Sequence, residues 1–229
     1  MKQFVSLWSA DQLDLGRAVD LVDDLVDGFH VDVFDGHDVA ELLYGPDLVA
    51  ALRRRTGRTV DVHLNVTDPD FWVPRFAAAG ADVITVQSAP CPDVDATLAG
   101  IRDTGCAAGL GLELHEPVPV AADRLGALDR VLVMGTETGV KGRDLDPAAP
   151  ERVTALTAAR AAAGWTGDLV VDGGIRRHTV PRLARAGADG VIPGSLVFAD
   201  PDPRRAAAAI KELGADTDLA DFWTAAVAR

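Results

Sequence analysis

The sequence predicts an α/β protein folded as a (β/α)₈ (TIM) barrel. Short β-rich runs alternate from end to end with alanine- and leucine-rich amphipathic stretches, an order typical of βαβ units and a parallel sheet. Eight such pairs fit into 229 residues, as in a closed barrel. An open doubly wound sheet would concentrate its chemistry at one or two switch points. Here polar residues end almost every strand, as in a barrel: Ser6, Asp32, His63, Gln87, Glu113, Asp172 and Ser195.

Eight segments have the composition of buried strands that end at turn residues. In chain order they are 4–9, 28–34, 59–66, 82–88, 107–114, 130–135, 168–174 and 190–195. The clearest helical patterns between them cover 45–57, 68–80 and 149–164. The phrases "AAGAD" at 78–82 and "RAGAD" at 185–189 predict helices that end at a glycine cap before a tight turn. We expect one domain over 1–229, with 215–229 as an additional C-terminal helix.

Composition excludes several functional classes. The hydrophobic content of 48% is enough for a substantial core, while the net charge of -13 argues against a nucleic-acid partner. The basic cluster "ALRRRTGR" is typical of the solvated end of a helix. No apolar run approaches the ~20 residues of a membrane span, and the N-terminus lacks a signal-peptide pattern. Cys91 and Cys106 have no disulfide spacing, so we expect reduced thiols and a cytoplasmic protein without a membrane partner.

Two predicted strands carry ionisable residues on one face. Side chains alternate along a strand, so His30, Asp32 and Phe34 share a face, as do Asp61, His63 and Asn65. A single inward histidine is more often a hydrogen-bonded core residue, and a single inward aspartate often caps a loop. Burying several such groups together is costly unless they pair or bind an ion.

A third strand completes the candidate metal set. Asp172 ends the segment "VVDGG", so two histidines and two carboxylates would project into one barrel mouth. Imidazole suits zinc, iron, cobalt or manganese better than magnesium. From periodicity alone, a metal site and a buried polar cluster remain open alternatives.

An ordered set of short motifs resembles the ribulose-phosphate 3-epimerase family. "SLWSAD" resembles its S-x-L-S-A-D, "FHVDVFDGH" its H-x-D-x-M-D-G-H and "DVHLNV" its D-x-H-L-M. "LVMGTETGVKGR", "VVDGGI" and "VIPGSLVF" are similar to the later motifs, in the same order. The resemblance spans residues 4–198.

The resemblance implies a barrel of the ribulose-phosphate-binding type and an isomerase that inverts C3 of a ketose phosphate. It implies metal ligands at His30, Asp32, His63 and Asp172 and one divalent ion, namely zinc, iron, manganese or cobalt. It also assigns Asp32 and Asp172 as the two catalytic acid/base residues, working through an enediolate. A sugar-phosphate substrate and a homo-oligomer follow from the same resemblance.

The resemblance further implies a substrate-binding set around the mouth. Gly173, Gly174, Gly194 and Ser195 would offer backbone N–H groups to a phosphate, although glycines there could serve tight turning alone. The loop residues Lys141 and Arg143 either contact that phosphate or form an exposed basic loop. The remaining expected substrate contacts are Ser6, Phe34, Asn65, Met134, Gly139 and Gly142.

The chain departs from the family at the substrate-facing rim. Phe34 and Asn65 stand where the family has methionines, and Gln87 stands at a family histidine. A buried polar side chain without a partner costs ~1–3 kcal/mol. We therefore expect Asn65, Gln87 and Glu113 to bind hydroxyls of an altered substrate, such as a ketohexose 6-phosphate.

Two alternative functions compete with epimerisation. One is another phosphate-binding barrel enzyme that uses an enediolate, as an isomerase, aldolase or decarboxylase. A Schiff-base aldolase needs a strand lysine and the related decarboxylases carry D-x-K-x-x-D, and neither feature is present. The other is a catalytically silent barrel with a regulatory role, which has no reason to retain four costly buried ligands.

Overall fold

The computed structural model describes residues 1–37 and 39–218. Its strands are β1 (Lys2–Ser6), β2 (Gly28–Asp35), β3 (Leu42–Leu43), β4 (Thr59–Asn65), β5 (Val83–Gln87), β6 (Ala107–Leu112), β7 (Arg130–Met134), β8 (Asp168–Asp172) and β9 (Gly190–Ile192). Its α-helices are α1 (Leu15–Val22), α2 (Pro46–Arg55), α3 (Pro69–Ala79), α4 (Val94–Asp103), α5 (Pro119–Ala122), α6 (Ala149–Ala163), α7 (Thr179–Ala186), α8 (Ser195–Phe198) and α9 (Pro203–Lys211). Two 3₁₀ helices are η1 (Leu7–Ser9) and η2 (Leu125–Ala127).

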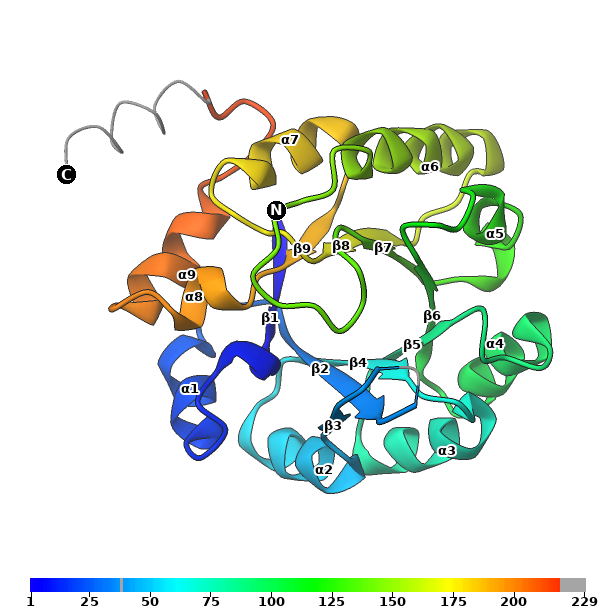
Figure 1. Cartoon of the computed structure of the whole chain (residues 1–229), viewed down its shortest axis with the longest axis horizontal. Coiled ribbons are helices and arrows are strands. Elements are labelled where there is room, and N and C mark those ends of the chain that lie inside the picture. The colour runs from blue at the N-terminus through cyan, green and yellow to red at the C-terminus, as the bar shows by residue number, and fades with distance from the viewer. Residues whose placement is uncertain (38, 219–229) are drawn as a thin grey trace.

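The parallel strands close into the predicted barrel. β1 pairs with β2 on one side and with β9 on the other, so the order β1-β2-β4-β5-β6-β7-β8-β9 returns to its start. Figure 1 looks into this barrel and shows the helices outside the ring of strands. Of the strands in the described residues, only β3 lies outside the ring, as an antiparallel partner of β2. The sequence pattern did not predict this two-residue strand.

Several predicted boundaries shift. The predicted strand 4–9 ends at Ser6, because the Ser6 hydroxyl accepts a hydrogen bond from the Trp8 N–H and begins η1. The helix after β6 is the single turn α5. Residues 215–218 contain no helix, and the remainder of the helix predicted over 215–229 lies outside the described residues. No helix in the described ranges combines the length and apolar character needed to cross a bilayer.

An aspartate repeatedly ties the start of one strand to its neighbour. Four aspartates that immediately precede a strand each accept a hydrogen bond, at 2.8–2.9 Å, from the N–H of the second residue of the preceding barrel strand. They are Asp27, Asp82, Asp129 and Asp189. In two of these turns a glycine with positive φ ends the helix, Gly80 at 104° and Gly187 at 102°. The glycine caps predicted from "AAGAD" and "RAGAD" are confirmed.

The barrel interior is apolar on one side and polar on the other. Outward-facing valines, leucines and isoleucines of the strands form a continuous core with the helices. Inside the barrel, a separate apolar cluster comprises Phe4, Leu132, Met134, Val170 and Ile192. Opposite it, β2, β4 and β5 present a wall of buried polar side chains: His30, Asp32, Asp61, His63, Asn65, Thr85 and Gln87.

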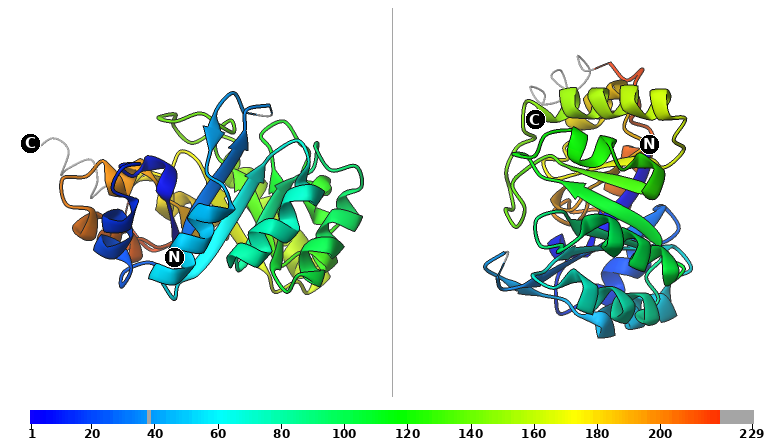
Figure 2. Two further views of the ribbon diagram at one scale, coloured as in Figure 1. Left: turned by 90° about the horizontal axis from the view of Figure 1, so that it is seen from below. Right: turned by 90° about the vertical axis from the view of Figure 1, so that its right-hand side faces the viewer.

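One end of the barrel carries the long loops. The loop between β7 and α6 crosses over the barrel mouth (Figure 1). Figure 2 shows this loop and the β2–β3 hairpin projecting from the same end, where the strands point. The buried polar side chains of β2, β4 and β5 therefore lie beneath a barrel mouth that the β7–α6 loop partly covers.

Candidate active site

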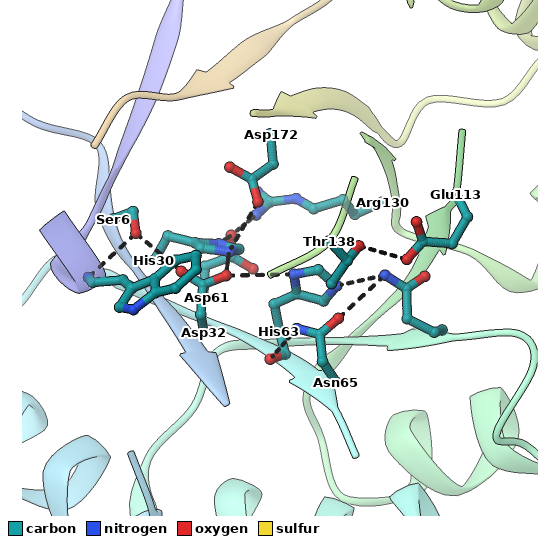
Figure 3. A network of polar contacts seen from close by, with 12 residues as sticks. Ser6, His30, Asp32, Asp61, His63, Asn65, Glu113, Arg130, Thr138 and Asp172 are labelled. Carbon is teal, nitrogen blue, oxygen red and sulfur yellow. Dashed lines mark hydrogen bonds and ion pairs between the residues drawn. The ribbon is translucent and has the colours of Figure 1, made fainter. Parts of the chain in front are cut away.

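The strand register brings the predicted metal ligands together. Asp32 on β2 is the direct neighbour of His63 on β4, and His30 is the neighbour of Ser6 on β1. Asp172 ends β8, which is separated from β1 by β9, and its side chain lies beside the same cluster (Figure 3). One ligand atom from each of His30, Asp32, His63 and Asp172 lies within 4.8 Å of all the others.

The distances within this cluster suit a shared cation. His30 Nε2 lies 3.2 Å from Asp32 Oδ1 and 4.0 Å from Asp172 Oδ2, and His63 Nδ1 lies 3.7 Å from Asp32 Oδ1. His63 Nδ1 is buried and has no hydrogen-bond partner in the described part of the chain. Two imidazoles, two carboxylates and an unpartnered ring nitrogen fit a divalent metal ion of the zinc, iron, manganese or cobalt type.

The pKa values of the two carboxyl groups in the cluster shift in opposite directions. Burial opposes ionisation of Asp32, but the charges and hydrogen bonds of His30 and His63 outweigh it and hold the pKa of Asp32 well below its ordinary value. Burial together with the charge of Asp32 raises the pKa of Asp172 to about 6. The Ser6 hydroxyl donates to Asp32 Oδ2 at 3.0 Å, which further favours the carboxylate there. The site thus contains one carboxylate that stays ionised and one carboxyl group that is readily protonated.

A buried ion-pair network supports His30 from below. His30 Nδ1 lies 2.8 Å from Asp61 Oδ2, and the Arg130 guanidinium lies 2.8 Å from the same oxygen without the alignment of a hydrogen bond. Burial disfavours the imidazolium, yet Asp32 and Asp61 raise the pKa of His30 well above its ordinary value. Burial likewise opposes the Asp61 carboxylate, but Arg130 and His30 lower the pKa of Asp61.

The sequence did not predict the contacts of Asp61 with His30 and Arg130. The alternation of Asp61 with His63 was visible, but it did not reveal which group Asp61 would contact. An arginine that opens the apolar strand "RVLVM" was the available signal for Arg130. Its partners come from β4 and β8 and are known only from the barrel register.

A cavity of about 280 Å³ lies above the cluster. Asp32, His63 and Asp172 form part of its lining, whereas His30 lies beneath them. The predicted substrate contacts that line it are Ser6, Phe34, Met134, Gly139, Lys141, Gly142, Arg143, Gly173, Gly174, Gly194 and Ser195. Lining residues that the sequence did not single out include Trp8, Thr136, Thr138, Arg176 and Ile192.

The loop over the mouth is held by a lysine and a tryptophan. The Lys141 ammonium donates to the Trp8 carbonyl oxygen at 2.9 Å and lies 4.0 Å from the centre of the Trp8 ring. The Trp8 ring in turn meets the edge of Phe34 at a centroid distance of 5.0 Å. A cation on an aromatic face is attracted by the ring quadrupole, so Lys141 holds the loop against η1 and lines the cavity.

The glycines after β8 and β9 lie where neighbouring atoms leave little room for a side chain. Gly173 and Gly174 have φ of 92° and 66°. A Cβ on Gly174 would lie 2.4 Å from backbone atoms of Leu145, and one on Gly194 would lie 2.4 Å from Ser9 Oγ. Tight turning is therefore part of their role. All three also line the cavity, where their backbone can approach a ligand.

The structure does not bring Asn65 to the cavity with the other predicted contacts. The Gln87 amide nitrogen lies 2.9 Å from His63 Nε2 and 3.4 Å from Asn65 Oδ1. Glu113 accepts a hydrogen bond from the Thr138 hydroxyl at 2.6 Å. Among the described residues, Asn65, Gln87 and Glu113 are absent from the cavity lining. These polar side chains, which we expected to face a sugar, instead contact a predicted ligand, each other and the covering loop.

Comparison with known proteins identifies the family. A family model described as the ribulose-phosphate 3 epimerase family matches residues 3–198. Ribulose-phosphate 3-epimerase from Bacillus subtilis is 34% identical over 90% of this chain and 96% of its own length. The Escherichia coli K12 enzyme is 35% identical over 90% and 93%, and ribulose-phosphate 3-epimerase 2 of Cupriavidus necator is 38% identical over 86% and 84%.

Solved structures confirm the barrel. KGPDC from Streptococcus mutans superposes with a TM-score of 0.72 at 17% identity, covering 97% of this chain and 98% of its own. Orotidine 5'-phosphate decarboxylase from Pyrococcus horikoshii OT3 gives 0.68 at 17% identity, covering 94% and 100%. At such low identity these likenesses show the fold alone, whereas the family match extends over most of the sequence. The chain belongs to the ribulose-phosphate 3-epimerase family and is an isomerase.

Proposed function

We propose that the protein inverts C3 of a ketose phosphate by acid/base catalysis between Asp32 and Asp172. The observation that carries this proposal is the pair itself: two carboxyl groups of opposite pKa shift line one cavity in a chain of this family. Epimerisation removes a proton beside a ketone and returns one to the opposite face of the carbon. It therefore needs two groups on opposite sides.

The geometry supports a separate role for each aspartate. Asp32 projects from β2 and Asp172 from β8, and Figure 3 shows them on opposite sides of the cluster. The Asp32 carboxylate, held ionised by His30 and the Ser6 hydroxyl, accepts the C3 proton. Asp172, whose pKa is raised to about 6, delivers a proton from the other face. The roles reverse in the reverse reaction.

The residues that would hold a metal ion are His30, Asp32, His63 and Asp172. When bound, a divalent ion there supplies positive charge that stabilises the developing enediolate oxygens. The apolar side chains of Phe34, Met134 and Ile192 line the same cavity and exclude water from the reacting carbon.

The phosphate group would lie at the β8 and β9 side of the cavity. Gly173, Gly174, Gly194 and Ser195 line this side with backbone that carries little side-chain bulk. Lys141 and Arg143 on the covering loop add positive charge to the same cavity. Together they favour a ligand with one anionic end.

The substrate that this site supports best is a pentulose phosphate such as ribulose 5-phosphate. The reason for expecting a longer sugar was the three rim residues Asn65, Gln87 and Glu113. These residues are engaged elsewhere, so a hexulose phosphate becomes the second choice. The relatives in Bacillus subtilis and Escherichia coli are named for ribulose phosphate, which supports the same order.

Deuterium exchange tests the proposal directly. The metal-loaded protein is incubated in deuterium oxide with ribulose 5-phosphate and, separately, with hexulose 6-phosphates, and NMR follows C3. We expect deuterium incorporation with inversion for the pentulose. D32N and D172N should each lose exchange by at least about 10²-fold, while D82N, at the opposite end of the barrel, should retain it. Exchange that persists in both active-site variants would overturn the two-aspartate mechanism.

We propose a homo-oligomer in the cytoplasm, on the strength of the family resemblance. Cys91 and Cys106 are free thiols in the structure, which accords with a reducing compartment. Light scattering of the purified protein measures its oligomeric state, and a monomeric mass would contradict the assembly.

A further inference from the structure

We infer that Gln87 is a positioning residue, whose side-chain oxygen accepts a hydrogen bond from His63 Nε2–H and thereby directs His63 Nδ1 at the metal. This inference rests on the proposed metal-dependent function and deepens it. Gln87 ends β5, is 2% exposed and does not line the cavity among the described residues. It therefore acts through His63 rather than on a substrate.

Two unpartnered atoms and one contact whose donor is not fixed by the atom positions point to this arrangement. The Gln87 amide nitrogen lies 2.9 Å from His63 Nε2, while the Gln87 amide oxygen and His63 Nδ1 are buried and unpartnered in the described chain. The oxygen and nitrogen of an amide have nearly the same shape, so their assignment follows from the hydrogen-bond network. Rotating the amide by half a turn places its oxygen beside His63 Nε2.

The rotated amide matches what a metal ligand requires. A histidine nitrogen binds a metal through its lone pair, and a hydrogen bond from the other ring nitrogen sets the tautomer. With Nε2–H donating to Gln87, the lone pair of Nδ1 faces Asp32 Oδ1 at 3.7 Å. Two electron-rich atoms facing each other at this distance call for a cation between them.

Asn65 can complete the same arrangement. Its amide lies 3.4 Å from the Gln87 atom that contacts His63. Its present contact, from Nδ2 to the His63 carbonyl oxygen, is 3.5 Å long and therefore weak. Turned over, the Asn65 NH₂ donates to the Gln87 oxygen at little loss. Two neighbouring amides would then support one histidine.

The neighbouring strand is shaped to hold the Gln87 amide. Gly111 on β6 pairs directly with Gln87, and a Cβ at Gly111 would lie 2.2 Å from Gln87 Oε1 and 2.7 Å from its Cδ. Gly111 is not among the glycines with positive φ. Its backbone conformation therefore does not require glycine, and the space taken by the Gln87 side chain does.

His63 and His30 would consequently ligate through different nitrogens. His30 Nδ1 is directed to Asp61, which leaves Nε2 for the cluster. His63 Nε2 is directed to Gln87, which leaves Nδ1. This difference gives the inference a spectroscopic signature that is independent of catalysis.

The test measures histidine tautomers in zinc-loaded, ¹⁵N-labelled protein by long-range ¹H–¹⁵N NMR. We expect His63 to carry its proton on Nε2 and His30 to carry its proton on Nδ1. A His63 with the proton on Nδ1 overturns the inference, even if the enzyme is active. A wild-type protein that binds no zinc contradicts the proposed function instead, which separates the two failures.

Variants provide the second readout, zinc affinity measured by titration with the metal alone. Q87L removes the acceptor and should weaken zinc binding about 10–100-fold, as should G111A, which displaces the amide. Q87E keeps an acceptor and should remain within about threefold of wild type. Q3L, a buried glutamine variant at the other end of the barrel, should lose stability without losing zinc affinity. Unchanged affinity in folded Q87L overturns the inference, and the wild-type tautomer decides it if the variants do not fold.

Discussion

Asp32 and Asp172 share one buried cluster, yet their carboxyl groups have opposite pKa shifts. Asp32 lies against His30, His63 and the Ser6 hydroxyl, all of which favour the ionised form. Asp172 has a weaker 4.0 Å contact with His30 and faces the charge of Asp32. Because burial opposes ionisation of both carboxyl groups, the difference between their neighbours is what moves the two pKa values apart.

We predict that D172N stabilises the metal-free protein at pH 8 while abolishing activity. The pKa of Asp172 is raised to about 6, so its contribution to stability is present below its unfolded pKa of about 4 and is lost as pH rises through the folded value. Removing the charge should increase the unfolding free energy by about 1–3 kcal/mol at pH 8 and by little at pH 4. Urea denaturation at both pH values checks this. Equal effects at the two pH values would contradict the assignment.

We predict that R130M destabilises the fold much more than K2M. Arg130 and Asp61 are both almost fully buried, so the variant leaves a buried carboxylate with His30 alone, at a cost of about 3–5 kcal/mol. Lys2 contacts Asp168 in the same network but is 50% exposed, and its loss should cost at most about 1 kcal/mol. The double variant D61N/R130M should recover part of the loss. Denaturation that finds R130M no less stable than K2M would rule out this role.

At the scale of elements, the β7–α6 loop is fastened to the rest of the barrel at several points, among them Thr138, which donates to Glu113, and Lys141. The loop crosses the mouth, and Lys141 fastens it to the ring and carbonyl of Trp8 (Figure 1). Gly139 and Gly142 both have φ of 77°, a conformation in which glycine avoids the steric cost of a side chain. The two glycines therefore allow the local conformation of the loop, while contacts with residues distant in the sequence, such as Trp8, hold it in position.

We predict that K141M raises KM for the sugar phosphate about 3–10-fold while leaving the Tm within a degree or two. The substitution removes the cation–π contact and the hydrogen bond, each of which contributes about 1 kcal/mol or less at an exposed site. Steady-state kinetics and thermal unfolding measure the two effects. R54M, which removes an exposed cation on α2, is the matched control and should change neither. An unchanged KM in K141M would show that the contact of Lys141 with Trp8 does not act on substrate binding.

At the scale of the whole molecule, the barrel divides its interior between an apolar half and a polar half. Phe4, Leu132, Met134, Val170 and Ile192 fill one side, while the buried polar side chains of β2, β4 and β5 occupy the other. The apolar side lowers the local dielectric and strengthens every interaction on the polar side. A cation bound among these buried carboxylates and imidazoles would therefore stabilise the folded protein.

We predict that metal binding stabilises the protein and continues to become tighter as pH rises above neutrality. A ligand at a hundred times its Kd adds about 2.7 kcal/mol. The pKa of His30 is raised well above its ordinary value by Asp32 and Asp61, and its ring must release a proton to bind the ion. Zinc titrations at several pH values, with thermal unfolding before and after a chelator, check this. An affinity independent of pH would mean that His30 is not a ligand.

The sequence alone determined the eight strands, the barrel, the glycine caps and the four candidate ligands. These features follow from local rules: alternation along a strand, helical periodicity and the conformations that glycine permits. Motif order added the family, which the comparisons confirmed.

Which polar groups contact one another depends on the tertiary structure. Asp61 contacts Arg130, Gln87 contacts His63, and Lys141 contacts Trp8 through strand register, barrel closure and loop path. No periodicity encodes these pairings, because the partners lie on different elements. The contacts of Asn65, Gln87 and Glu113 could not be predicted for the same reason: alternation places a side chain inside the barrel, but its depth and neighbours depend on the register of the adjacent strands.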